Sequence, residues 1–295
     1  MRDYIEIFKD FLLNEKKSSK NTVESYLRDI NQFITYCTPS GINDTVALDC
    51  DFLQKYFEYL SVIGKSDATK SRIAASLRCY YKVLINKGIA KNNPVEAIKV
   101  KKAERKLPGV LDSNEIVLLL SQPDSTDYKG IRDKAMLEIL YATGIKVSEL
   151  IDLKVSDVNL QIGILHLHKD KKERIIPMYP AAVKSVADYL VNVRPAIVLD
   201  EDEDKLFTNM TGTSMSRQGF WKIIKHYADM AGIKKDITPH TLRHSFAAHL
   251  LENGAKLTDI KEMLGHTDIS STQIYAQLMK SKYSTAYAKF HPLAK

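Results

Sequence analysis

Apolar residues recur every three or four positions through most of the first ninety residues, with charged residues between them. Near the start, Ile5 and Phe8 belong to such an apolar stripe, which is typical of an amphipathic helix. Asn21, followed three positions later by Glu24, has the form of a capping box and predicts the start of a second helix. The pattern predicts helices at residues 3–15, 21–34, 52–62 and 68–87.

A charged connector interrupts this pattern after residue 90. Asn92, Asn93 and Pro94 are turn-forming residues, and the helical periodicity resumes only beyond Leu107 and Pro108. The chain is long enough for two ordinary domains with cores of their own. We therefore expect a helical bundle at residues 1–90, a basic linker at 91–110 and a second domain at 111–295.

The second domain combines helical patterns with one pair of strand-like segments. The two segments flank the polar turn Asp170-Lys171-Lys172, which predicts a β-hairpin. The expected fold class is therefore mostly α with a small β-hairpin or sheet, an α+β arrangement. The predicted elements of this domain are helices at 113–120, 130–141 and 216–232 and strands at 163–168 and 173–178.

The positive charge of the chain is concentrated in one stretch. A net charge of +7 over 295 residues indicates nucleic acid only weakly. Residues 65–106, however, hold twelve lysines and arginines and three acidic residues. A solvated helix face would give the same run, but its concentration favours contact with a phosphate backbone. The candidate DNA-binding residues on the fourth predicted helix are Lys70, Arg72, Arg78 and Lys82.

The cysteines and the lack of long apolar runs indicate the compartment. Cys37, Cys50 and Cys79 lie far apart, lack the spacing of a metal site and cannot all form pairs. The charged start of the sequence does not resemble a signal peptide, and no run approaches the roughly 20 apolar residues of a membrane span. We expect a cytoplasmic protein with no membrane partner.

Groups suited to phosphate chemistry gather near the end of the chain. Pro239 fits the first turn of a helix, and His240 and Arg243 then lie three positions apart on one helical face. An imidazole and a forked guanidinium that converge in this way suit a phosphodiester oxygen. His266 adds a second imidazole, and Tyr275 supplies a candidate nucleophile.

A tyrosine nucleophile sets requirements for its surroundings. Its hydroxyl has a pKa of about 10, so attack on phosphorus needs a nearby base and positive groups around the non-bridging oxygens. Lys146 and Lys169 join Arg243 and His266 as the candidate positive groups. No paired carboxylates accompany these motifs at metal-binding spacing, which argues against a two-metal nuclease. We expect no metal and no cofactor.

Each of these residues also has a purely structural explanation. A single tyrosine or histidine is more often part of a core or a surface, and only the spacing favours chemistry. Lys169 lies near Lys171 and Lys172, so a solvated cluster of charge would look the same. His244 directly follows Arg243 and is expected to point elsewhere on the helix in a structural role.

These motifs resemble those of the tyrosine recombinase (phage integrase) family. The resemblance rests on His240-Thr241-Leu242-Arg243-His244, on Leu264-Gly265-His266 and on Tyr275 nine residues later. The chain as a whole resembles the bacterial Xer recombinases. The resemblance implies an N-terminal SAM-like core-binding bundle and a C-terminal catalytic domain that close around duplex DNA as a C-shaped clamp.

The resemblance also implies a role for each site residue. Tyr275 would form a 3′-phosphotyrosyl bond and release a 5′ hydroxyl, without metal or ATP. Lys169 would be the general acid and His240 the general base, while Arg243 and His266 would bind the scissile phosphate. Two further positions complete the set: Glu149 would support the site, and Lys146 stands where the family has arginine.

Partners and alternatives follow from the same resemblance. The implied assembly is a tetramer, a dimer of dimers on paired recombination sites with or without a second recombinase, in which the tail after Tyr275 packs on the next subunit. Its role would be chromosome dimer resolution, and so chromosome partition in the cell cycle, or the integration and excision of a mobile element. The alternatives are a type IB topoisomerase-like relaxase and a catalytically weakened DNA-binding protein, for which Lys146 is the only support.

Overall fold

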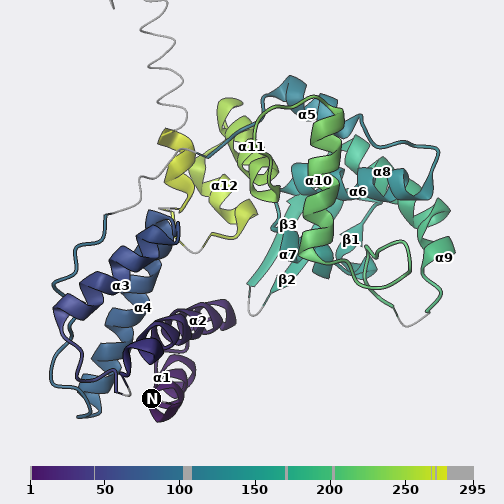
Figure 1. Cartoon of the computed structure of the whole chain (residues 1–295). Coiled ribbons are helices and arrows are strands. Elements are labelled where there is room, and N and C mark those ends of the chain that lie inside the picture. Colours follow the sequence, from purple (N-terminus) through teal and green to yellow (C-terminus); the bar gives the residue numbers. More distant parts are fainter. Residues whose placement is uncertain are drawn as a thin grey trace, which may run out of the picture. The chain divides into compact units, whose positions relative to one another are not determined.

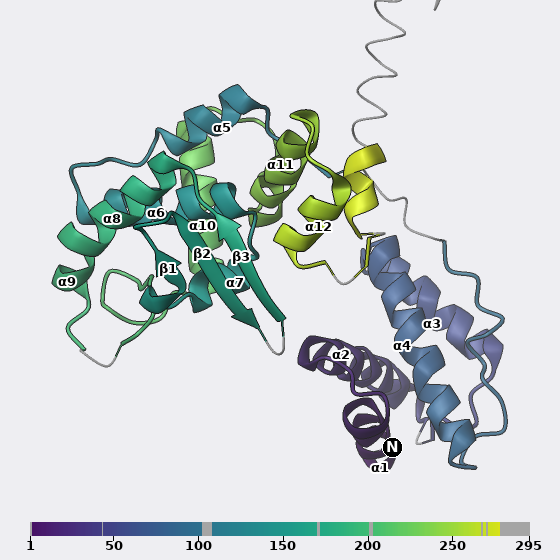
Figure 2. The ribbon, with the colours of Figure 1, turned by 180° about the vertical axis from the view of Figure 1, so that it is seen from behind.

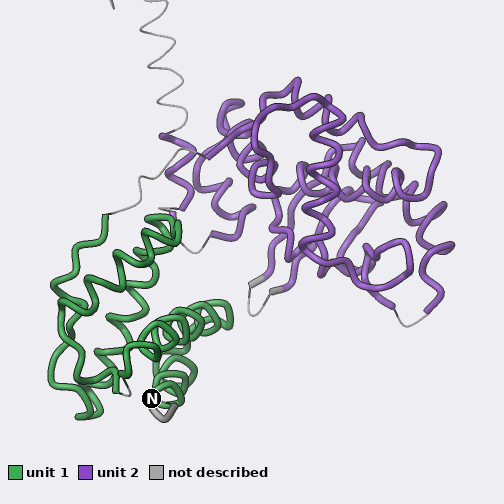
Figure 3. Tube along the Cα trace, viewed as in Figure 1, with its two compact units in different colours: residues 1–105 green, residues 106–295 purple. Residues whose placement is uncertain are grey.

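The chain forms two compact units, residues 1–105 and residues 106–295, each with its own hydrophobic core (Figure 3). The structure, a computed structural model, describes residues 2–42, 44–101, 108–169, 172–200, 203–266, 268–269 and 271–277. The expectation of a mostly helical chain with a small sheet is confirmed. Within these described ranges, no helix is long and apolar enough to cross a membrane.

The first unit is a helical bundle around one core. Rings such as Phe33 and Tyr56 are fully buried between its helices. Phe8 joins them from the first helix and packs edge-on against Tyr80, with ring centroids 5.4 Å apart. The elements are α1 (Arg2–Asp10), the π-helical turn η1 (Phe11–Glu15), α2 (Lys20–Cys37), the 3-10 turn η2 (Thr38–Ser40), α3 (Cys50–Val62) and α4 (Asp67–Asn86) (Figure 1).

Side-chain caps determine where these helices begin. The Ser19 hydroxyl accepts a hydrogen bond from the Thr22 backbone N–H at the start of α2. Ser66 and Thr69 repeat this arrangement at the start of α4. The prediction of a cap at Asn21 is wrong, because Ser19 has the extended backbone of a cap (φ −61°, ψ 150°) and Asn21 is already helical.

The connector after α4 packs in part on the first unit. Val95 and Ile98 are buried in its core, and the Arg78 guanidinium donates hydrogen bonds to their carbonyl oxygens at 3.4 and 2.9 Å. Part of the predicted linker of residues 91–110 therefore packs on the first unit, and the bounds of the linker stay a prediction. Its apolar positions are too few to indicate an element of their own, yet they complete the core of the bundle.

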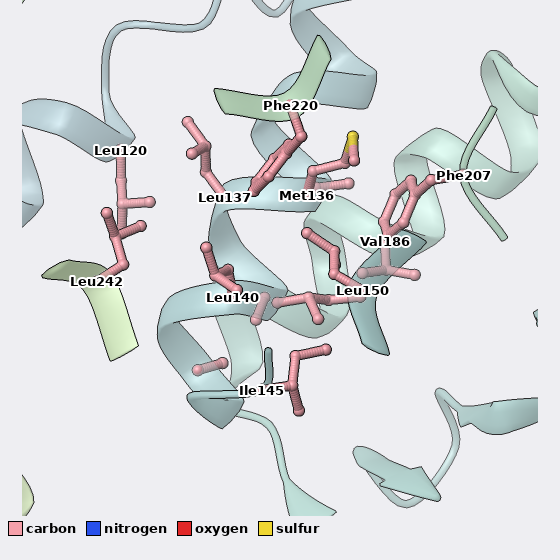
Figure 4. Close-up of a cluster of buried hydrophobic side chains, with 14 of the residues drawn as sticks. Leu120, Met136, Leu137, Leu140, Ile145, Leu150, Val186, Phe207, Phe220 and Leu242 are labelled. Carbon is pink, nitrogen blue, oxygen red and sulfur yellow. The ribbon is translucent and has the colours of Figure 1, made fainter. Parts of the chain in front are cut away.

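The second unit surrounds helix α6, whose residues are buried on most sides and which packs against α8 and α11. Leu137 and Leu140 of α6 lie in one apolar cluster with Leu150 of α7 and Phe220 of α10 (Figure 4). Leu242 of α11 belongs to the same cluster, which therefore joins α7 and α11, the helices of Glu149 and Arg243, to α6. The helical elements are α5 (Ser113–Leu120), α6 (Tyr128–Thr143), α7 (Val147–Asp152), the 3-10 turn η3 (Val155–Asp157), α8 (Pro180–Asn192), α9 (Arg194–Ile197), α10 (Arg217–Met230), α11 (Pro239–Glu252) and α12 (Leu257–Leu264).

Three antiparallel strands form a small sheet in the order β1-β2-β3 (Figure 2). Side chains alternate across it: Leu165 and Leu167 of β2 and Ile176 of β3 are buried, whereas His168 is exposed. The predicted hairpin is confirmed, and β1 adds a short third strand. The strands are β1 (Val158–Asn159), β2 (Ile164–Lys169) and β3 (Lys172–Pro177).

Candidate active site

Helix α11 carries the central motif of the site. Thr238 caps it by accepting a hydrogen bond from the Thr241 backbone N–H at 3.3 Å, and Pro239 occupies its first turn as expected. Arg243 is buried, with 4% of its surface exposed, whereas His240 one turn earlier is exposed. The two residues that were expected to converge therefore lie in different environments.

The Arg243 guanidinium joins three segments of the second unit. It donates hydrogen bonds to the Gly144 carbonyl oxygen at 2.5 Å and to the Leu264 carbonyl oxygen at 2.7 Å. Gly144 has a left-handed backbone (φ 58°), and a Cβ there would lie 2.3 Å from the Phe246 ring. Burial lowers the pKa of Arg243, but an arginine remains protonated in a protein. A fixed positive charge therefore lies where α11, α12 and the turn after α6 meet.

Tyr275 lies within helical residues 271–277, and 1% of its surface is exposed. Its ring packs in an apolar cluster with Phe246 and Leu264. Its hydroxyl lies 2.9 Å from His244 Nδ1. Burial raises the pKa of Tyr275, so the hydroxyl keeps its proton in this state.

His244, not His240, contacts the Tyr275 hydroxyl. The expectation that His244 points elsewhere is wrong, because positions four apart share a helix face and the rings of His240 and His244 lie 6.4 Å apart on it. Burial, reinforced by His240 and Arg243, lowers the pKa of His244 to about 4. The imidazole is therefore neutral near pH 7 and has one nitrogen that can accept a proton.

His266 follows the C-terminal end of α12. Its Nδ1 lies 2.9 Å from the Thr272 hydroxyl, in the segment that carries Tyr275. Burial, with the charges of Arg243 and Lys146, lowers the pKa of His266 to about 4. Arg243 and Lys146 are therefore near enough to His266 to influence its pKa.

Lys146 is exposed at the start of α7, and Glu149 holds its backbone. The Lys146 backbone N–H donates a hydrogen bond to Glu149 Oε2 at 2.8 Å, and Glu149 Oε1 lies 2.8 Å from Arg174 Nη2. Burial would raise the pKa of Glu149, but the Lys146 hydrogen bond and Arg174 outweigh it and keep the pKa below its usual range. An ionised Glu149 thus supports the turn that presents Lys146.

Arg174 is a site residue that the sequence analysis missed. Besides Glu149, it contacts the Met263 carbonyl oxygen, to which its Nη1 donates a hydrogen bond at 2.9 Å. The alternation of side chains along a strand could have indicated this role, because it places Arg174 on the opposite face of β3 from the neighbouring Glu173. Arg174 therefore links β3 to α7 and to the end of α12.

Some of the predicted residues lie wholly or partly outside the described part of the chain. The backbone of Lys169 pairs with that of Lys172 at the end of the hairpin, but its side chain is outside the described residues. The tail at residues 278–295 is also outside them. One cluster in the described part could hold a metal ion, although none was expected, and it consists of His166, His168 and Glu173.

The basic face of α4 is partly occupied by contacts within the first unit. Arg72 forms an ion pair of 2.5 Å with the buried Asp29, and Arg78 donates to backbone carbonyls. Lys70 lies 2.8 Å from Asp67, and Lys82 is exposed. The four residues stay predicted DNA contacts, but the partners of Arg78 come from the connector, could not be seen in a charge pattern and indicate a structural role.

This difference gives a prediction for two basic residues of α4. Arg78→Met should lower the free energy of unfolding by about 1–3 kcal/mol, because buried carbonyl acceptors would lose a charged donor. Lys82→Ala should leave stability unchanged and reduce the slope of log affinity for DNA against log salt by about 0.9. Chemical denaturation and salt titrations of binding measure both. A flattened salt slope in a stable Arg78→Met protein would contradict this assignment.

Residues 109–282, more than half of the chain, match the phage integrase family, and residues 5–88 match the phage integrase N-terminal SAM-like domain. The chain belongs to the phage integrase family. The resemblance seen in its motifs is confirmed, as is the pairing of a SAM-like domain with the family's catalytic domain.

Similar proteins agree with this family. The tyrosine recombinase XerD of Staphylococcus epidermidis is 42% identical over 295 residues, which cover 100% of both chains. The crystal structure of XerA recombinase is 27% identical, with a TM-score of 0.56 over 99% of this chain and 98% of that one. The XerH recombinase bound to a palindromic difH substrate shares the fold, with 20% identity and a TM-score of 0.74 over 92% of this chain and 81% of that one.

Proposed function

We propose that this protein is a site-specific tyrosine recombinase that cleaves and rejoins duplex DNA through a 3′-phosphotyrosyl intermediate, without metal or ATP. The observation that carries the proposal is the 2.9 Å contact between the Tyr275 hydroxyl and His244 Nδ1, beside the buried Arg243. A nucleophile, a neutral base and a fixed cation thus meet in a chain of the phage integrase family.

The attack begins with a proton transfer from Tyr275. His244 is unprotonated near pH 7 and accepts the proton as the oxygen attacks phosphorus. This gives His244 the role that the motif resemblance gave to His240. His240, exposed in the first turn of α11, is then available to contact the phosphate, where the helix N-terminus also favours an anion.

Charge on the phosphate is stabilised by groups held in advance. Arg243 is fixed by two backbone carbonyls, so little reorganisation is needed when negative charge develops. Lys146 and His266 face the same oxygens, and Glu149 positions the backbone of Lys146. Lys169 protonates the leaving 5′ oxygen. Because the phosphotyrosyl bond conserves the energy of the phosphodiester, a second strand can reverse it.

Cleavage also requires a rearrangement around Tyr275. A hydroxyl of a side chain with 1% exposure cannot meet a phosphate, so residues 271–277 must shift far enough to expose it while it stays within reach of His244. We propose that assembly on DNA drives this movement. The assembly is a tetramer, a dimer of dimers on paired sites with or without a second recombinase, in which the tail of each chain docks on its neighbour and the two units of each chain close as a clamp.

The biological setting is proposed from the relatives and the cysteines. The motif resemblance implies chromosome dimer resolution or the integration of a mobile element, and the relatives named tyrosine recombinase XerD support the chemistry that both roles share. The three free cysteines are consistent with a reduced cytoplasm.

Two assays test the function. Duplexes that bind the protein are first selected from a random library. Each is then given a nick near its centre. Cleavage next to the nick releases a short strand, so that rejoining is impossible and the protein stays covalently bound to the DNA. A denaturing gel should then show a covalent complex, whereas a DNA-binding protein without catalysis would give none. Strand exchange between two such duplexes should follow, and a relaxase acting on one duplex would not give exchanged products.

Lys146 gives a prediction within this mechanism. Lys146→Arg should raise single-turnover cleavage about tenfold, because a forked guanidinium can hold two phosphate oxygens where an ammonium holds one. The matched control is Lys154→Arg, since Lys154 also precedes a short helix and its backbone N–H donates to a carboxylate, that of Asp157, at 2.8 Å. Equal or slower cleavage by Lys146→Arg would mean that the site is adapted to lysine.

A further inference from the structure

The β2–β3 hairpin presents three metal-binding side chains on one face. His166 and His168 are two positions apart on β2 and therefore point to the same side, with ring centroids 4.0 Å apart. Glu173 of β3 is the direct partner of His168 in the strand register. The three side chains are thus brought together by the backbone pairing of the hairpin, not by chance contacts of a loop.

The ligand atoms are close to the spacing that a metal ion requires. Glu173 Oε1 lies 3.1 Å from His168 Nδ1, and Glu173 Oε2 lies 3.7 Å from His166 Nε2. One ligand atom from each residue lies within 4.8 Å of the other two. A tetrahedral zinc ion with bonds of about 2.0–2.1 Å would hold its ligands roughly 3.4 Å apart. Small side-chain rotations would close this difference.

One atom of the cluster makes no hydrogen bond. His166 Nε2 is inaccessible to solvent and makes no hydrogen bond, and a buried nitrogen in that condition is costly to leave unsatisfied. Glu173 Oε2 lies 3.7 Å from this nitrogen, which is beyond hydrogen-bond distance. An ion bound between the three side chains would satisfy it.

We propose that His166, His168 and Glu173 form a binding site for Zn²⁺ that fastens β2 to β3. Two imidazoles and one carboxylate suit zinc, whereas Mg²⁺ prefers a set of oxygen ligands. Three protein ligands leave a fourth position for water. The site is separate from the proposed cleavage steps, which need no metal, although His168 is next in the chain to Lys169.

Binding to the untagged full-length protein, freed of metal with a chelator, tests the site without DNA. Titration calorimetry with zinc chloride should show one site, with no binding of Mg²⁺. His168→Gln and Glu173→Gln should each weaken binding by at least about tenfold, since even changes around metal ligands cost that much. The matched control is His226→Gln, because His226 is an exposed histidine on α10.

Two further measurements locate the ion. Zinc should slow amide exchange in β2 and β3 of the wild-type protein and not of His168→Gln, provided that both have the same exchange pattern without metal. The absorption of bound Co²⁺ should lack sulfur charge-transfer bands, which excludes the three cysteines. Failure of the wild type to bind zinc, or equal binding by His168→Gln and Glu173→Gln, would overturn the proposal and leave the recombinase function untouched.

Discussion

Tyr275→Phe is expected to abolish covalent attachment to DNA and to lower cleavage by on the order of 10⁵–10⁶-fold, the loss typical of removing a nucleophile. Only the hydroxyl is deleted, so the ring still fills its place beside Phe246 and Leu264. DNA binding should therefore be retained. Denaturing gels on nicked duplexes measure attachment, and mobility shifts measure binding.

The matched control for this variant is Tyr141→Phe. The Tyr141 hydroxyl lies 2.9 Å from His249 Nδ1, the same chemical pair at the same distance as Tyr275 and His244. Each variant should lower the free energy of unfolding by about 1 kcal/mol, the net contribution of one hydrogen bond. Only Tyr275→Phe should lose attachment. A phosphotyrosyl adduct that persists in Tyr275→Phe would mean that another residue is the nucleophile.

The second large effect distinguishes between two histidines of α11. His244→Gln should lower single-turnover cleavage by about 10²–10⁴-fold, because this is the usual contribution of a general base. His240→Gln should cost less, since its ring is exposed and the Tyr275 hydroxyl is bonded to His244. If His240→Gln cleaves DNA more slowly than His244→Gln, the general base is His240, as the motif resemblance implied.

The pH dependence of His244→Gln provides a second readout for the same role. Without a base, cleavage depends on the small ionised fraction of Tyr275, which grows about tenfold per pH unit below the pKa of its hydroxyl, and burial raises that pKa above its usual value. The rate of the variant should therefore rise steeply between pH 7 and 9. If the pH–rate profile of the variant is parallel to that of the wild type, His244 contributes through packing and is not the base.

The sequence predicted the type of most elements because the apolar stripes of α2, α3 and α4 are the same faces that the core buries. It predicted helix starts less well, since a serine two residues earlier can cap as effectively as an asparagine. Ser19 and Asn21 illustrate this, because the choice between them depends on the backbone conformation at each position.

Motif spacing alone predicts only part of the candidate site. Spacing selected Arg243 and Tyr275 as candidates, but the partner of the Tyr275 hydroxyl depends on how the later segment packs over α11. The roles of Arg78 and Arg174 depend on backbone carbonyls, to which every residue type contributes equally. A pattern of side chains therefore carries no sign of such contacts.

The contacts of Arg174 limit which segments of this chain can be replaced by the corresponding segments of a relative. Arg174 holds both Glu149 and the Met263 carbonyl, and a Cβ at Gly265 would lie 2.5 Å from its guanidinium. A chimera that takes only the segment after residue 238 from a relative would separate these interlocking parts. Exchanges whose boundary falls before α5 keep them together with the central helix α6, so the module for building hybrid proteins from this chain is the whole second unit, residues 106–295, not the motif-bearing C-terminal segment alone.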